Sequence, residues 1–111
     1  MADGSTSTLT NPVTGTGTVN YIPKWNGSGT SLTNSLIYDS GSVVSIGTAS
    51  PDTSALFQMT STTKGFLPPV MTATQRTSIS SPAAGLVVYQ SDGTAGLYIY
   101  TGGVWRALTM V

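Results

Sequence analysis

The sequence predicts a mostly β fold of short antiparallel strands and hairpins with one short helix. Short runs rich in β-branched and aromatic residues recur along the chain. Gly, Asn, Asp and Ser cluster between these runs, as they do at turns. Only one segment combines a helix-capping pattern with a following stop signal. Short strands separated by turn signals at regular spacing are typical of all-β proteins.

The N-terminal part predicts an arm followed by a β segment. Residues 1–18 are almost entirely small and polar, so they predict a flexible arm, or an attachment arm that orders on a neighbouring subunit or platform. Pro23 cannot donate a backbone hydrogen bond to a neighbouring strand, which places its run at a sheet edge or a strand end. The β segment, residues 19–60, holds four strand candidates, at 19–25, 31–38, 43–46 and 55–59.

The remaining residues, 61–111, predict a C-terminal β module with one short helix at 72–81. Two consecutive prolines at 68–69 impose an extended path before it. Thr72 and Gln75 have the spacing of a capping box, and Pro82 ends the pattern. Two helical turns are not stable alone, so this helix must dock on the module. Arg76 either pairs with a carbonyl or carboxylate or is solvated, and solvation is the default expectation.

The stretch 85–108 predicts a three-stranded meander that is apolar on both faces. Asp-Gly at 92–93 and Gly-Gly at 102–103 predict its two hairpin turns. Leu86 and Val88 point one way and Val87 and Tyr89 the other, while Leu97 and Ile99 oppose Tyr98 and Tyr100. A strand with one solvated face would alternate apolar and polar residues. The meander therefore needs cover on both sides.

Composition excludes several classes of function. Charged residues make up 7% of the chain and the net charge is zero. The chain therefore lacks the excess of basic residues that binding to nucleic-acid phosphates requires. No run approaches the roughly 20 apolar residues of a membrane span, and we expect no membrane insertion. A surface with so little charge repulsion associates easily.

We expect no catalysis, no cofactor and no metal. The chain has no His and no Cys, so the commonest general base and the thiolate nucleophile are missing. Its acidic residues are four isolated aspartates, three of them in turn contexts: Asp3, Asp39, Asp52 and Asp92. Two of them could still converge as a hydrolase pair, and turn aspartates with carbonyl oxygens could hold a structural Ca²⁺.

Aromatic side chains on strands offer a different function, a carbohydrate-binding surface. Sugars stack on exposed Tyr and Trp rings, although core or interface packing is the commoner use of such residues. The candidate ligand-binding residues are Tyr21, Trp25, Tyr98, Tyr100 and Trp105.

Two parts of the sequence carry a family resemblance. The more specific is TKGFLPP at 63–69, then MT at 71–72, QR at 75–76, Ile79, Pro82, GLVVY at 85–89, a Tyr, Gly-Gly and Trp105. The weaker is TGTGTVNYIPKW at 14–25, then NS at 34–35 and VSIGTASP at 44–51. Together, over roughly residues 10–108, they resemble phage tail-fibre and other virion-appendage proteins, a type common in phages of Bacteroidota and in phage-derived genes of those bacteria.

The resemblance implies a homotrimeric, β-rich and enzymatically inert virion protein on the surface of the extracellular particle. It implies a short fibre, a spike or a capsid-attached head fibre. The N-terminal arm would bind other virion proteins, and the appendage could contact the host surface, including its glycans. Val70 stands where relatives often carry a basic residue, so a role for charge there is not carried over. The chain ends at Val111 without a self-cleaving chaperone domain, which favours a short appendage whose trimer forms unaided, or a fragment of a longer fibre.

With this resemblance the two-sided meander acquires a specific expectation. One face is expected on the chain's own helix and Pro-Pro segment. The other is expected on the same strands of neighbouring subunits, in an intertwined homotrimer.

Overall fold

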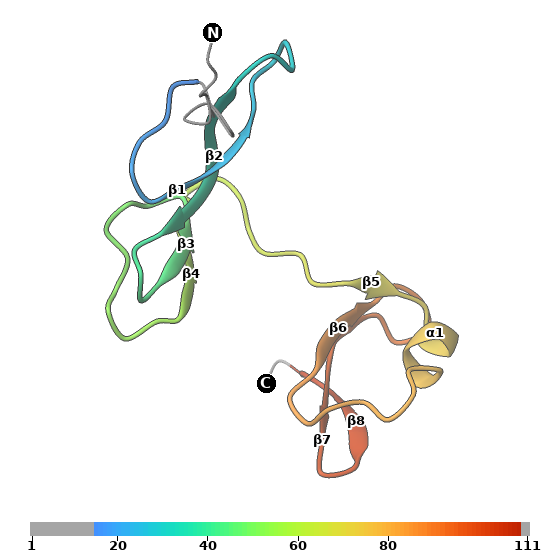
Figure 1. The fold of residues 1–111 in the computed structure, drawn as a ribbon. Helices are drawn as coiled ribbons and strands as arrows, with labels where there is room; N and C mark the ends of the chain where they lie inside the picture. The colour runs from blue at the N-terminus through green and yellow to red at the C-terminus, as the bar shows by residue number, and fades with distance from the viewer. Residues whose placement is uncertain (1–14, 110–111) are drawn as a thin grey trace, which may run out of the picture. The chain divides into compact units, whose positions relative to one another are not determined.

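A computed structural model describes residues 15–109 of the chain (Figure 1). These residues form eight strands and one short helix, which confirms the predicted mostly β fold. The chain divides between Lys64 and Gly65 into two compact units. Each unit is built on one four-stranded sheet.

The first sheet has the strand order β1-β2-β3-β4, so the Pro23 strand lies at an edge, as its missing N–H requires. Pairing is antiparallel from β1 to β3, but β3 and β4 are parallel. The strands are β1 (Tyr21–Trp25), β2 (Leu32–Asp39), β3 (Val44–Ile46) and β4 (Phe57–Met59).

The last residues of the expected arm are part of this first unit. Gly15 forms a parallel bridge with Leu32 of β2, and the Thr16 N–H donates to the Leu32 carbonyl at 3.1 Å. The Thr18 N–H donates to the side-chain oxygen of Asn34 at 2.8 Å. Residues 1–14 of the arm lie outside the described residues.

The second sheet has the order β5-β6-β7-β8, with a parallel pair at β5-β6 and antiparallel pairs after it. Gly102 and Gly103 form the turn between β7 and β8 with φ of 63° and 81°, which confirms the predicted two-residue hairpin. The elements are β5 (Val70–Met71), α1 (Ala73–Thr77), β6 (Val87–Gln90), β7 (Gly96–Thr101) and β8 (Val104–Ala107).

The two parallel pairs are a feature that the sequence does not predict. A parallel pair needs a crossover connection, whereas an antiparallel pair is marked by a short turn between its strands. In the first unit the crossover is the helix-free segment 47–56, and in the second it is the segment 72–86 that contains α1. Each crossover leaves its sheet and returns to it, so it lies over one face.

The helix α1 (Ala73–Thr77) occupies the first half of the predicted range 72–81. Thr72 caps its N-terminus in the predicted capping box with Gln75, and the Asp92 carboxylate accepts a further bond from the Ala73 N–H at 2.7 Å. The helix ends early because the Ser78 hydroxyl bonds back to the Thr74 carbonyl at 2.7 Å. Such side-chain bonds compete with continuation of the helix.

Arg76 fastens this helix to the sheet, so the expectation of a solvated side chain was wrong. Its guanidinium lies 4.2 Å from the ring centre of Tyr98 and 5.4 Å from that of Trp105. Its Nε donates to the buried side-chain oxygen of Gln90 at 2.7 Å. The amide group of Gln90 in turn donates to the Asp92 carbonyl at 2.9 Å. A helix too short to be stable alone is held by this network.

We expect Gly47→Ala to destabilise the first unit. Gly47 begins the crossover at φ 91°, and a methyl group there would collide with the Thr60 carbonyl oxygen. Strain of this kind lowers the free energy of unfolding by about 1–3 kcal/mol. Urea unfolding followed by circular dichroism measures the loss. The control Gly27→Ala, which meets nothing within 4 Å, should change stability by less than about 0.5 kcal/mol; equal effects would contradict the assignment.

We expect Arg76→Met to loosen α1, because it keeps a long side chain but leaves the buried Gln90 oxygen without its donor. An unsatisfied buried polar group costs about 1–3 kcal/mol. The loss is measured by thermal unfolding, with Thr74→Ala on the exposed side of the same helix as the control. If the two variants have the same midpoint, Arg76 does not hold the helix.

Candidate functional site

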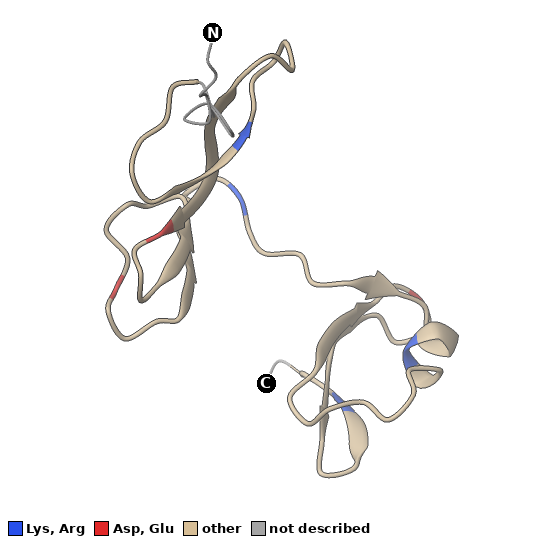
Figure 2. Ribbon diagram, viewed as in Figure 1, with Lys and Arg blue, Asp and Glu red and all other residues tan. Residues whose placement is uncertain are grey.

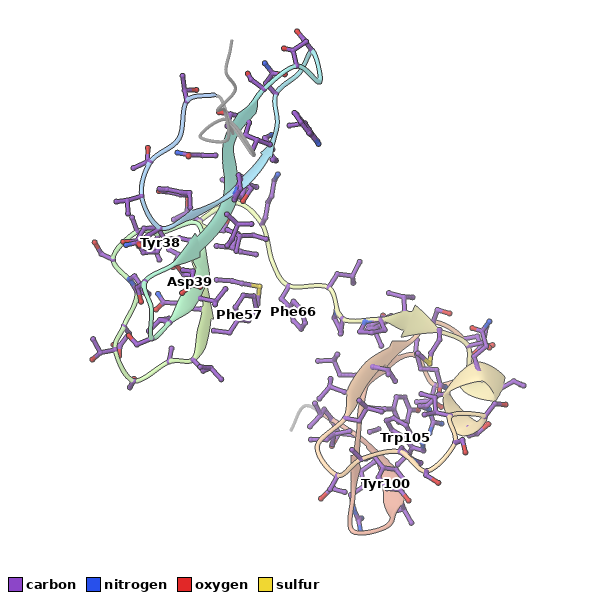
Figure 3. All side chains as sticks on the ribbon, in the orientation of Figure 1. Tyr38, Asp39, Phe57, Phe66, Tyr100 and Trp105 are labelled. Carbon is purple, nitrogen blue, oxygen red and sulfur yellow. The ribbon has the colours of Figure 1, made fainter. Side chains whose placement is uncertain are left out.

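The first sheet leaves one apolar face uncovered. In a sheet, directly paired residues point to the same side. The pairs Ile37–Ile46 and Ile46–Met59 therefore form a row across β2, β3 and β4, and the pair Val44–Phe57 lies beside it. We call these five residues the first apolar face. Phe57 is 51% exposed, and in Figure 3 its side chain projects from β4 on the side away from the crossover.

The opposite face of the first sheet is closed by its crossover. Ser45 is fully buried there, and its hydroxyl donates to the Thr48 carbonyl at 2.8 Å. Gln58, its partner on β4, accepts from the Asp52 N–H at 2.7 Å. The buried Val43 precedes β3. The crossover is thus held on this side of the sheet by polar contacts, and it does not cover the first apolar face.

The second sheet repeats this arrangement. Its register aligns Val70, Tyr89 and Leu97 in one row and Val87 with Ile99 in the next. Arg106 of β8 pairs with Ile99, so one basic side chain lies at the edge of this face. The row continues onto Leu108, whose N–H donates to the Leu97 carbonyl at 2.9 Å. All of these side chains are exposed or half-buried. The second apolar face consists of Val70, Val87, Tyr89, Leu97, Ile99 and Leu108.

The other face of the second sheet carries Val88, Gln90, Tyr98 and Trp105, and α1 covers it through Arg76. Figure 3 shows Trp105 on the side of the sheet that faces the helix. One of the two expected contacts of the meander, packing on the chain's own helix, is therefore present.

Few apolar side chains are buried inside either unit. Among the described residues the buried hydrophobic side chains are Val43, Val88 and Tyr98. Large exposed hydrophobic residues are far more numerous, and they include members of both apolar faces. Contiguous exposed apolar surface of this kind marks a protein–protein interaction site.

The five predicted carbohydrate-binding residues are divided between the two units. Tyr21 stacks edge-on against Tyr38 with ring centres 5.1 Å apart, and Tyr100 stacks in the same way on Trp105 at 5.4 Å. Tyr98 is buried under Arg76. Trp25, at the end of β1, is 64% exposed. Of the five, its ring is the most open to a ligand.

Charge is sparse on the described part of the chain, as Figure 2 shows. Each described aspartate accepts a local hydrogen bond: Asp39 from the Gly41 N–H, Asp52 from Ser54, and Asp92 from the Ala73 N–H. The Ser54 hydroxyl, together with the Ser54 N–H, lowers the pKa of Asp52 below its ordinary 3.8. Because its folded pKa is lowered, this contact stabilises the fold above the ordinary pKa and is lost only as the pH falls through the lowered value.

Residues 15–109 contain no group of three or more His, Cys, Asp or Glu side chains that could hold a metal ion. The one helix in this range, α1, has five residues, far short of a membrane-spanning length.

Sequence reasoning missed the first apolar face and the roles of Arg76 and Gln90. The strands at 43–46 and 55–59 were predictable, but the parallel pairing that aligns Ile46 with Met59 was not. The one available signal for Gln90 was its position as a polar residue among the apolar residues of its strand.

No curated protein and no solved structure matches the chain. The family model of the phage tail-like trimerisation region matches residues 45–110, more than half of the chain. The matched region contains the entire second apolar face and, from the first, Ile46, Phe57 and Met59. The uncovered apolar faces are the kind of surface that a trimer needs, and the chain belongs to the phage tail-like trimerisation region family, as a trimeric structural component of phage tail-like type.

Proposed function

We propose that the chain is a non-enzymatic structural protein of a phage virion appendage. It forms an intertwined homotrimer on the surface of the extracellular particle, as a short fibre, a spike or a capsid-attached head fibre. Residues 1–18 act as the arm that binds other virion proteins. The motifs at 63–89 support an origin in phages of Bacteroidota or in phage-derived genes of those bacteria.

The second apolar face carries this proposal. It consists of six apolar or aromatic side chains, it lies opposite the face that α1 covers, and it falls within the family's trimerisation region. Fully burying one side chain of this size is worth about 1.5–3 kcal/mol. Association costs about 4–15 kcal/mol, so six such side chains on each copy supply enough free energy even though they are only partly exposed beforehand.

A structural role also agrees with the polar residues of the described chain. Asp39, Asp52 and Asp92 each accept hydrogen bonds from a nearby backbone N–H, so each has a structural task. A titrating catalytic group would instead need a pKa poised near the working pH. The pKa of the Asp52 carboxyl is lowered, which moves it away from that range.

Glycan binding at the host surface is the alternative function, and the exposed indole of Trp25 favours it. Asn26 follows it in the chain, and the Asn26 amide contacts the hydroxyls of Thr30 and Ser31 at 3.3 and 3.1 Å. An exposed aromatic ring beside amide and hydroxyl groups is the chemistry that stacks on a sugar and bonds its hydroxyls. An appendage can carry both functions.

We expect the purified protein to have three times the mass of the 11.4 kDa chain, and Leu97→Asp to reduce it to monomers. The substitution places a charge in the middle of the second apolar face, where assembly would have to bury it. Size-exclusion chromatography with light scattering measures the mass. Ser80→Asp, an exposed change on the crossover of the same unit, is the control and should remain trimeric. A folded wild-type monomer would overturn the proposed function.

The two tryptophans should separate the alternative function from folding. If the chain binds glycans through Trp25, Trp25→Ala abolishes binding on a glycan array and leaves the circular dichroism spectrum unchanged. Trp105→Ala instead lowers the unfolding temperature, because Trp105 packs on Tyr100 and under Arg76. A wild-type protein that binds no glycan, or a Trp25→Ala variant that binds normally, removes the alternative.

A further inference from the structure

We propose that the first apolar face is a second contact between copies of this chain, formed around the threefold axis of the proposed homotrimer. The inference rests on the proposed homotrimer and names the surface that the first unit contributes to it. The occupant of the face is the same face of the two other copies.

The composition of the face suits contact with copies of itself. Its central row, Ile37, Ile46 and Met59, crosses three adjacent strands without a polar residue, and Val44 and Phe57 extend it. The register places Asp39 beside Val44 at its end, and the Asp39 carboxylate already accepts the Gly41 N–H at 2.8 Å. Three copies of such a face can meet without bringing like charges into a buried centre.

The chain's own crossover is not available to cover this face. Segment 47–56 is tied to the other side of the sheet through Ser45 and Gln58. The crossover thus covers one face of the first sheet, as α1 covers one face of the second sheet. Each sheet therefore has one covered face and one exposed apolar face that requires burial. The second apolar face is the proposed trimer contact, and the first apolar face can be buried in the same way.

The first apolar face is also continuous with the region that defines the family. The match to the trimerisation region begins at Ser45, inside β3, and therefore includes the last two residues of β3 and all of β4. Three of the five residues of the first apolar face lie within it: Ile46, Phe57 and Met59.

The chain connection makes even a modest apolar face sufficient. The two units are joined directly at Lys64 and Gly65, so association of three second units tethers three first units together. Short tethers give effective concentrations on the order of millimolar. Burial of a few side chains at about 1.5–3 kcal/mol each is then enough to close the second contact.

A single introduced cysteine tests the inference in the full chain, because the natural sequence contains none. In Met59→Cys the thiols of the three copies converge at the proposed axis, so a short bismaleimide at low protein concentration should link two copies of each trimer. The matched control is Thr53→Cys, an exposed position on the crossover at the opposite side of the sheet, which should not link. Light scattering of both unreacted variants gives the oligomeric state, and denaturing gels give the linked fraction.

The outcomes separate the two proposals. A trimer in which Met59→Cys links to dimers and Thr53→Cys does not supports the inference. A trimer in which Met59→Cys does not link, or links no more than the control, overturns the inference and leaves the homotrimer in place. Products larger than dimers show contact between trimers through this face and also overturn the inference. A monomer overturns the proposed function and the inference with it.

Discussion

The constraint on which the structure depends is that each sheet can cover only one of its two faces. Both units use a crossover between parallel strands for this cover, the segment 47–56 in one and the segment around α1 in the other. Neither connection is long enough to wrap both sides. The remaining faces are apolar, and within the described residues the buried hydrophobic side chains number only three. Units with so small a core are marginal on their own, and association would bury further apolar surface.

The covered faces are held by polar contacts as much as by apolar packing. Ser45 and Gln58 fasten the first crossover, and Arg76 and Gln90 fasten the second. Among the described residues, no buried side-chain polar atom is left without a hydrogen-bond partner. Such satisfied contacts fix which face is closed, because the crossover cannot shift without breaking them. The choice of the open face is therefore built into each unit before assembly.

The low charge of the chain also favours association between its copies. With a net charge of zero, copies of the chain meet without the repulsion that keeps monomers apart. Hydroxyl and amide groups supply the remaining polarity, and none of them titrates near neutral pH. The pKa of Asp52 is lowered by its hydrogen bonds from Ser54.

The sequence alone determined the strands other than β5, the two hairpin turns and the capping box at Thr72, because turn chemistry and β-branched runs act over a few neighbouring residues. It also showed that the meander had no polar face. Only the tertiary structure decided that β3 pairs with β4, that β5 pairs with β6, and that Arg76 lies between Tyr98 and Gln90. Parallel pairing joins strands across a crossover and leaves no local turn signal in the sequence. Neighbouring residues therefore do not reveal which face is covered or which hydrogen bonds hold the crossover there.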